Sequence, residues 1–245
     1  MTREVKVYEL KEDLIRNAAE KIVSIAQKSI QNRGQFAWSL SGGSTPKEVY
    51  SMLAALPLKE KIDWEKTHIF WGDERSVVRT HPDSNFRMAK ESLLDAVEIP
   101  PANIHRVASE EDPMLAAQQY EDDIREFFGI SDGIFPEFDL ILLGMGDDGH
   151  TASLFPDTEA LKVQDRLVVD NFVKKLNTHR ITFTFPIINH ARNVLFIISG
   201  SVKSKMIKQV LANTDAPKTL PSQLVQPKSG SLFWFLDKDA AADLT

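Results

Sequence analysis

The run Phe138-Asp-Leu-Ile-Leu-Leu143, followed at once by Gly144-Met-Gly146-Asp-Asp-Gly-His150, is the clearest indication of the fold. A short, largely apolar run that ends in glycines is typical of a strand buried on both faces of a parallel sheet. Along the rest of the chain, short runs of β-branched and aromatic residues alternate with segments of helical period. We therefore expect an α/β fold: a mostly parallel, Rossmann-like sheet flanked by helices on both faces.

Six further strands are expected around this central one. The apolar positions Leu14, Ala18, Ile22, Ile25 and Ala26 share one helical stripe that stops at Gly34, which predicts the first helix. Polar clusters directly follow several of the strands, where open α/β sheets form their ligand crevice. The expected strands are Val5–Leu10, Phe36–Leu40, Ile69–Trp71, Ile181–Phe185, Asn193–Ile198 and Leu232–Leu236.

Composition limits the kind of protein and its partners. The 245 residues are 42% hydrophobic, and no low-complexity tract divides them, so we expect a single domain over residues 1–245. The absence of cysteine excludes disulfides, thiolate zinc sites and a cysteine nucleophile. A net charge of -6 without a dense Lys/Arg stretch disfavours nucleic-acid binding, so an anionic substrate would need a local cationic pocket.

The N-terminal sequence Met1-Thr-Arg-Glu-Val-Lys lacks the apolar core of a signal peptide. No apolar run in the chain approaches the length that spans a membrane. We expect a cytoplasmic protein, a monomer or small homo-oligomer, with no membrane partner.

The loop after the second expected strand suits an anion. Ser41-Gly42-Gly43-Ser44-Thr45-Pro46 supplies two glycines that let the backbone approach a ligand, hydroxyl donors, and free N–H groups where a helix begins. Taken alone, the same segment fits a glycine-rich turn and a capped helix equally well. Ser44 and Lys47 also match the Ser-x-x-Lys pattern of acylating serine enzymes, but no Lys-Thr-Gly accompanies them, which disfavours that interpretation.

Two other strand ends carry cations. Gly72-Asp-Glu-Arg75 follows the third expected strand as a loop. An arginine next to two acids usually forms a solvated ion pair, although at a strand end it can present a planar fork to phosphate. Lys203, after Ser199-Gly-Ser, begins a helix, where its charge opposes the helix dipole; this placement suggests an anion partner.

The segment Gly144-Met-Gly-Asp-Asp-Gly-His150 matches Gly-x-Gly-x-x-Gly, but Asp147 and Asp148 would repel the pyrophosphate of a dinucleotide. Asp-x-His after a strand instead suits acid-base chemistry, in which a carboxylate fixes the tautomer of an imidazole that removes a proton from water. A metal site built from Asp147, Asp148 and His150 is disfavoured because no second histidine lies nearby at a ligand spacing. The other five histidines lack such a neighbour in sequence and are expected to be structural or exposed: His68, His81, His105, His179 and His190.

Several motifs together resemble those of the glucosamine-6-phosphate isomerase/6-phosphogluconolactonase family, and within it the 6-phosphogluconolactonases. The resemblance spans nearly the whole chain, in the family's order. One departure is Val78, where proline often stands in the family, and it alters loop stiffness rather than chemistry. The motifs are Leu40-Ser-Gly-Gly-Ser-Thr-Pro46, Gly72-Asp-Glu-Arg75, Asp83-Ser-Asn85, Gly144 to Pro156, Arg180-Ile-Thr to Gly200-Ser-Val-Lys203, Leu220 to Val225 and Leu232 to Asp237.

The resemblance implies hydrolysis of 6-phospho-D-glucono-1,5-lactone to 6-phospho-D-gluconate, the second step of the oxidative pentose phosphate pathway, without cofactor or metal. It implies His150 as the general base and Asp148 as the carboxylate that orients it. The small-molecule sugar phosphate would be held through its phosphate by Ser41, Gly42, Gly43, Ser44, Thr45, Arg75, Lys203 and Arg180.

Two rival functions remain. Glucosamine-6-phosphate deaminases resemble the same loops, but theirs continue from the histidine to Asn-Glu-Pro, whereas this chain has Leu154-Phe155-Pro156, and Phe155 cannot move a proton. A regulator that binds a sugar phosphate without turning it over is the other rival, because function is grafted onto a shared fold. The presence of both Asp148 and His150 counts against it.

Overall fold

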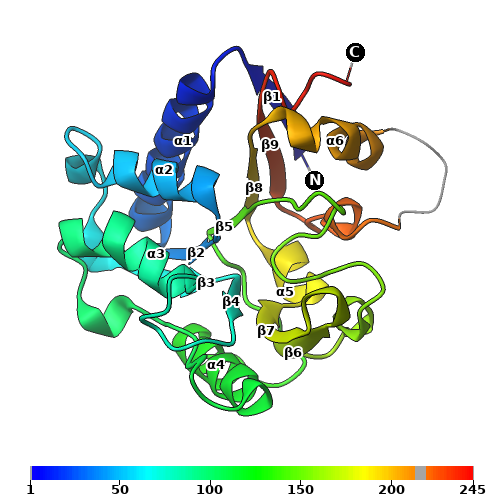
Figure 1. Ribbon diagram of the computed structural model, residues 1–245. Coiled ribbons are helices and arrows are strands. Elements are labelled where there is room, and N and C mark those ends of the chain that lie inside the picture. The colour runs from blue at the N-terminus through cyan, green and yellow to red at the C-terminus, as the bar shows by residue number, and fades with distance from the viewer. Residues whose placement is uncertain (1, 213–218, 245) are drawn as a thin grey trace.

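The computed structural model describes residues 2–212 and 219–244. Its main sheet has six parallel strands in the order β1-β9-β8-β5-β2-β3 (Figure 1). All seven strands expected from the sequence are present, although β7 belongs to a second sheet. The main-sheet strands are β1 (Thr2–Tyr8), β2 (Phe36–Leu40), β3 (Thr67–Trp71), β5 (Leu140–Leu143), β8 (Asn193–Ile198) and β9 (Ser231–Asp237).

Helices cover both faces of this sheet, as expected. In β5, Leu140 and Leu142 pack into the core under α1, α2 and α3, whereas Ile141 and Leu143 pack into the core on the opposite face with α4, α5 and α6. Figure 1 shows α1 and α2 on one side of the strands and α5 and α6 on the other. Burial on both faces explains why the strand sequences are almost continuously apolar. The helices are α1 (Lys11–Arg33), α2 (Ser44–Leu53), α3 (Asn85–Ser92), α4 (Pro113–Phe128), α5 (Phe185–His190) and α6 (Ser204–Leu211).

Eight short 3-10 helices lie in the described connections. They are η1 (Lys59–Lys61), η2 (Trp64–Lys66), η3 (Leu94–Ala96), η4 (Pro101–Asn103), η5 (Glu159–Lys162), η6 (Lys174–Leu176), η7 (Ser201–Lys203) and η8 (Pro221–Leu224).

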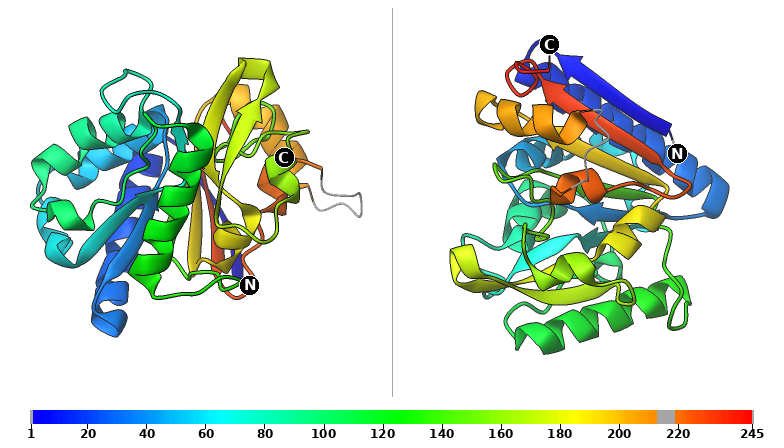
Figure 2. Two further views of the ribbon diagram at one scale, coloured as in Figure 1. Left: turned by 90° about the horizontal axis from the view of Figure 1, so that it is seen from below. Right: turned by 90° about the vertical axis from the view of Figure 1, so that its right-hand side faces the viewer.

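A second sheet, which the sequence did not predict, lies beside the carboxyl ends of the main strands. Its three antiparallel strands are β4 (Asp73–Arg75), β7 (Thr178–Phe183) and β6 (Val168–Val173), and the β6–β7 hairpin projects from the body (Figure 2). The expectation that residues 72–75 form a loop was therefore wrong. The chain leaves β3 at Gly72 and pairs directly with β7, where the N–H of Phe183 donates to the Gly72 carbonyl at 2.8 Å.

The two acids of β4 are buried, and neither forms the expected surface ion pair with Arg75. Glu74 accepts the backbone N–H groups of Asn85 at 2.7 Å and Phe86 at 2.8 Å, so its carboxylate satisfies free donors at the start of α3. Asp73 accepts the hydroxyl of Ser153 at 2.6 Å. Burial raises the pKa of Glu74, while the N–H donors from Arg75, Asn85 and Phe86 oppose that rise.

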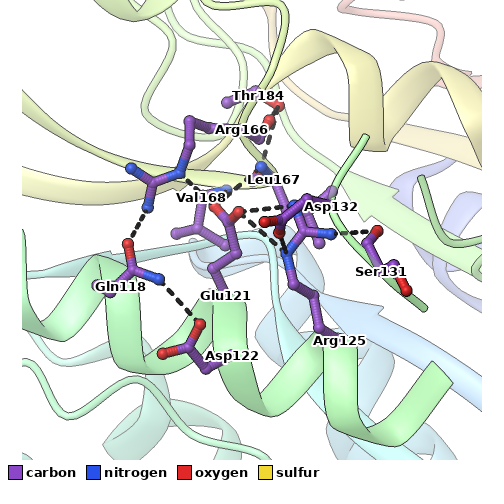
Figure 3. A network of polar contacts seen from close by, with 10 residues as sticks. All are labelled: Gln118, Glu121, Asp122, Arg125, Ser131, Asp132, Arg166, Leu167, Val168 and Thr184. Atoms are coloured by element: carbon purple, nitrogen blue, oxygen red, sulfur yellow. Dashed lines mark hydrogen bonds and ion pairs between the residues drawn. The ribbon is translucent and has the colours of Figure 1, made fainter. Parts of the chain in front are cut away.

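A buried carboxylate also fastens the second sheet to α4. Glu121 of α4 is 3% exposed and accepts hydrogen bonds from the side chains of Arg125 and Arg166 and from the backbone N–H groups of Leu167 and Val168 (Figure 3). These hydrogen bonds offset the free-energy cost of burying the charged carboxylate. Loss of any one of them would leave the buried charge partly uncompensated. The contacts fix the start of β6, and hence the hairpin that carries Arg180.

Candidate active site

A cavity of about 290 Å³ opens at the carboxyl ends of β2, β3, β5 and β8. A second hollow of about 300 Å³ adjoins it and shares Arg75, His150 and Lys203 in its lining. Every residue that the sequence placed in the site lines one or both. The first is lined by Ser41, Gly42, Gly43, Ser44, Thr45, Arg75, His150 and Lys203, and the second by Arg75, Asp148, His150, Arg180 and Lys203.

The loop after β2 is held in place by Tyr50 of α2. The Tyr50 hydroxyl accepts the N–H of Ser41 at 2.9 Å and donates to the Ser41 carbonyl at 2.8 Å. Helix α2 begins at Ser44, and Pro46 fits within its first turn because the first turn needs no N–H from it. The N–H groups of the first turn therefore face the cavity end of the loop, in the arrangement that binds anions.

Gly42 allows the loop to pack against α3. A Cβ at this position would lie 2.0 Å from Oδ1 of Asn85. Asn85 is itself fixed, because its Nδ2 donates to the Asp73 carbonyl at 2.9 Å. The loop after β2 and the strand β4 are thereby locked together through Asn85.

His150 and Asp148, which the sequence predicts to be an acid-base pair, are in direct contact. Nδ1 of His150 lies 2.5 Å from Oδ1 of Asp148, and Lys175 of η6 donates to Oδ2 of Asp148 at 3.1 Å. Burial would raise the pKa of Asp148, but the hydrogen bond and charge of His150, together with Lys175, outweigh it and lower that pKa to about 2. Asp148 is therefore ionised at neutral pH and accepts a hydrogen bond from the N–H at Nδ1 of His150.

The imidazole of His150 is closely packed by Phe155 and Gly146. Its ring stacks on Phe155 with centroids 4.0 Å apart. A Cβ at Gly146 would lie 2.0 Å from Cε1 of His150, so only glycine fits there. The turn is closed by the N–H of Gly146, which donates to the His150 carbonyl at 2.9 Å.

Two arginines lie side by side in the second hollow. Arg75 of β4 pairs in register with Arg180 of β7. Burial lowers the pKa of Arg180, and the charge of Arg75 lowers it further. Among the described residues neither guanidinium forms an ion pair, and their hydrogen bonds go to backbone carbonyls of Asp83 and His179. Two adjacent cations without carboxylate partners form a site for an anion.

Lys203, by contrast, already has an anionic partner. Its Nζ contacts Oδ1 of Asp147, a residue to which the sequence assigned no role. The anion partner suggested by the position of Lys203 at a helix start is therefore, in this structure, an aspartate of the Gly146–Gly149 turn.

Three residues of this region were missed from the sequence: Tyr50, Asn85 and Lys175. Lys175 lies 27 positions from Asp148 in sequence, and no local pattern connects them. Tyr50 and Asn85 look like ordinary helix residues, and only their contacts with Ser41 and Asp73 connect them to the site.

Three of the other histidines also have carboxylate partners. Nδ1 of His179 lies 2.7 Å from Asp170, Nδ1 of His105 lies 3.0 Å from Asp123, and Nδ1 of His81 lies 3.8 Å from Asp83. None of these histidines lines either hollow of the site. Within residues 2–212 and 219–244, no group of three or more His, Asp or Glu side chains is arranged to hold a metal ion. In the same ranges no helix has the length and apolar character needed to cross a membrane.

A parallel α/β sheet whose strand ends hold a cationic cavity beside a histidine–carboxylate pair is typical of enzymes that act on phosphorylated small molecules. The sequence profile of the family described as Glucosamine-6-phosphate isomerases/6-phosphogluconolactonase matches residues 9–234. The chain belongs to this family.

Similar proteins of known name support the assignment along the whole chain. A 6-phosphogluconolactonase from Synechocystis sp. is 46% identical over 245 residues, which cover 100% of this chain and 99% of the relative. One from Nostoc sp. is 44% identical and is covered completely. The solved structure of 6-phosphogluconolactonase from Trypanosoma cruzi superposes with a TM-score of 0.87 at 31% identity, covering 100% of this chain and 98% of that one.

Proposed function

We propose that this protein hydrolyses 6-phospho-D-glucono-1,5-lactone to 6-phospho-D-gluconate, the second step of the oxidative pentose phosphate pathway. The observation that carries the proposal is the placement of His150, with Nδ1 bound by Asp148, at the boundary of a cationic cavity. The similarity to named 6-phosphogluconolactonases supports the choice of substrate.

The substrate's phosphate would be held by the loop 41–45 at the start of α2 together with Arg75, Arg180 and Lys203. This anchor would orient the lactone so that C1 lies near His150, and positioning of this kind supplies a large share of a rate enhancement. Arg75 and Lys203 line both hollows, and the start of α2 lines the first, so a phosphate bound there would meet cations and free N–H groups together.

His150 would then act as the general base. Because Asp148 binds the proton-bearing Nδ1, Nε2 carries the lone pair and takes a proton from the water that attacks C1. The tetrahedral intermediate collapses with cleavage of the bond between C1 and the ring oxygen, and the imidazolium returns its proton to that oxygen. Asp148 stabilises the imidazolium during the step.

The deaminase alternative lacks a group that it needs. At the position where that reaction uses a glutamate, this chain has Phe155, which is 8% exposed and stacks on the His150 ring. Phe155 thus holds the base in place and cannot transfer a proton.

Replacement of His150 by alanine tests the proposal. We expect kcat to fall about 10²- to 10⁴-fold, with a smaller change in KM because the phosphate contacts are untouched. Rates must be corrected for spontaneous opening of the lactone, and the folding of the variant must be checked by thermal denaturation. A folded His150→Ala protein with near-normal turnover would move the base role to another residue.

A single domain over residues 1–245, a cytoplasmic location and a monomeric or small homo-oligomeric state are further parts of the proposal. Similar plant proteins include two named as chloroplastic, so location can differ between relatives.

A further inference from the structure

The turn after β5 presents two successive aspartates that bind different partners. Asp148 contacts His150 and Lys175 and takes part in the proposed mechanism. Asp147 contacts Lys203, and the mechanism does not use it. The side chain of Asp147 is 65% exposed, whereas that of Lys203 is 25% exposed. The contact joins the turn after β5 to the connection between β8 and α6, across the mouth of the site.

Lys203 occupies a central position among the cations of the site. It lines the cavity at the start of α2 and also the hollow that contains Arg75 and Arg180. Among the described residues, both arginines are without a carboxylate partner within ion-pair distance, so of these three cations only Lys203 is neutralised before a ligand arrives. An anion that binds Lys203 must therefore compete with Asp147.

We infer that Asp147 is an internal competitor for Lys203 that sets the affinity of the site for phosphate monoesters. Its carboxylate occupies Lys203 in the free protein, so a phosphate must displace Asp147 to bind the same ammonium group. The affinity for substrate and product is lower than the cations alone would give, and recapture of Lys203 by Asp147 assists release of the product. The inference rests on the proposed function, which brings a sugar phosphate to this site.

The opposite role makes the opposite prediction. If Asp147 serves to position Lys203 for the phosphate, then removing its charge weakens phosphate binding. If Asp147 competes with the phosphate, removing its charge strengthens binding. The sign of the change in affinity therefore separates the two roles.

The probe is inorganic phosphate, titrated by calorimetry into the full chain at fixed ionic strength. We expect Asp147→Asn to lower the Kd for phosphate about 2- to 5-fold, which is the range expected for a partly exposed ion pair. The KM for 6-phosphogluconolactone should also fall. The gain should shrink as salt is added, because exposed charges are screened. Asp147→Glu, which keeps the charge, should stay near the wild-type Kd.

Asp157→Asn is the matched control. Asp157 is exposed in the segment that follows the same turn and lines neither hollow, so this variant makes the same change in net charge away from Lys203. We expect its Kd for phosphate to equal that of the wild type. An unchanged or higher Kd in Asp147→Asn, or an equal gain in Asp157→Asn, would overturn the inference.

A double-mutant cycle adds a test that does not depend on the single variant alone. In a Lys203→Gln background the effect of Asp147→Asn on the Kd for phosphate should vanish, because the competed cation is gone. A gain that persists without Lys203 would refute the competition. Because calorimetry needs no turnover, failure of the protein to hydrolyse the lactone would reject the proposed function while leaving the phosphate measurements to decide the role of Asp147.

Discussion

Gly146→Ala should disable the proposed base without replacing any ionisable side chain. The added methyl carbon would lie 2.0 Å from Cε1 and 2.1 Å from Nδ1 of His150, whereas unstrained contacts between heavy atoms are about 3.5 Å. The imidazole, or the turn that carries it, must therefore move by more than about 1 Å. Because Nδ1 is one of the displaced atoms, its 2.5 Å contact with Asp148 is disturbed as well.

A displacement of about 1 Å at a reacting group costs on the order of 10²-fold in rate, so we expect kcat to fall about 100-fold. The change in KM should be small, because the loop 41–45 and the cations are not displaced. Overpacking at this site should also lower the free energy of unfolding by about 1–3 kcal/mol, which thermal denaturation can measure separately.

Gly144→Ala is the control for this prediction. It makes the same substitution two residues earlier, but there the nearest atom to the new methyl group is Oγ of Ser41 at 3.9 Å, an ordinary contact. The assay is hydrolysis of 6-phosphogluconolactone, corrected for spontaneous opening. If a folded Gly146→Ala protein kept the kcat of Gly144→Ala, the position of the His150 ring would not matter to catalysis, and the reasoning would be wrong.

Three further predictions concern the charges of the site. Because the pKa of Asp148 is lowered to about 2, this carboxylate should not titrate above about pH 4. Any fall of kcat/KM above that pH should therefore persist in Asp148→Asn, on a lower plateau of kcat, and a fall that disappears in this variant would be assigned to Asp148. Arg75→Ala and Lys203→Ala should each lower kcat/KM for the phosphorylated lactone roughly 30-fold, which corresponds to about 2 kcal/mol of transition-state binding, and should lower kcat/KM for gluconolactone much less. Equal losses on both lactones would contradict a phosphate contact. Activity should survive exhaustive treatment with a chelator, and loss with recovery on adding a divalent ion would reject metal independence.

The sequence predicted the main sheet and the site loops because both depend on local patterns. Continuous apolar strands such as β5 and β8 indicate a parallel sheet buried on both faces, and the glycine-rich and Asp-x-His segments stand directly after strands. The second sheet was not predicted because β4 has only three residues, two of them acidic. Its burial depends on donors supplied by α3 and Ser153, which lie far along the chain.

Within the site, sequence reasoning identified the residues but not all of their partners. Asp148 and His150 are two positions apart, so their pairing could be predicted from a local turn. Lys175 lies 27 positions from Asp148 in sequence, and Lys203 lies 56 positions from Asp147. No sequence pattern indicates either contact. The fold alone brings these lysines to the turn after β5.

Nearby acidic side chains explain how the guanidinium groups of Arg75 and Arg180 can lie side by side as an anion site. Burial lowers the pKa of Arg180, and the charge of Arg75 lowers it further. The charge of Asp73 acts in the opposite direction, yet its carboxylate is occupied by the hydroxyl of Ser153 and forms no ion pair with either arginine among the described residues. Asp73 therefore offsets part of the repulsion through its charge without occupying any donor of either arginine, so the donors that do not bind backbone carbonyls remain available to a phosphate.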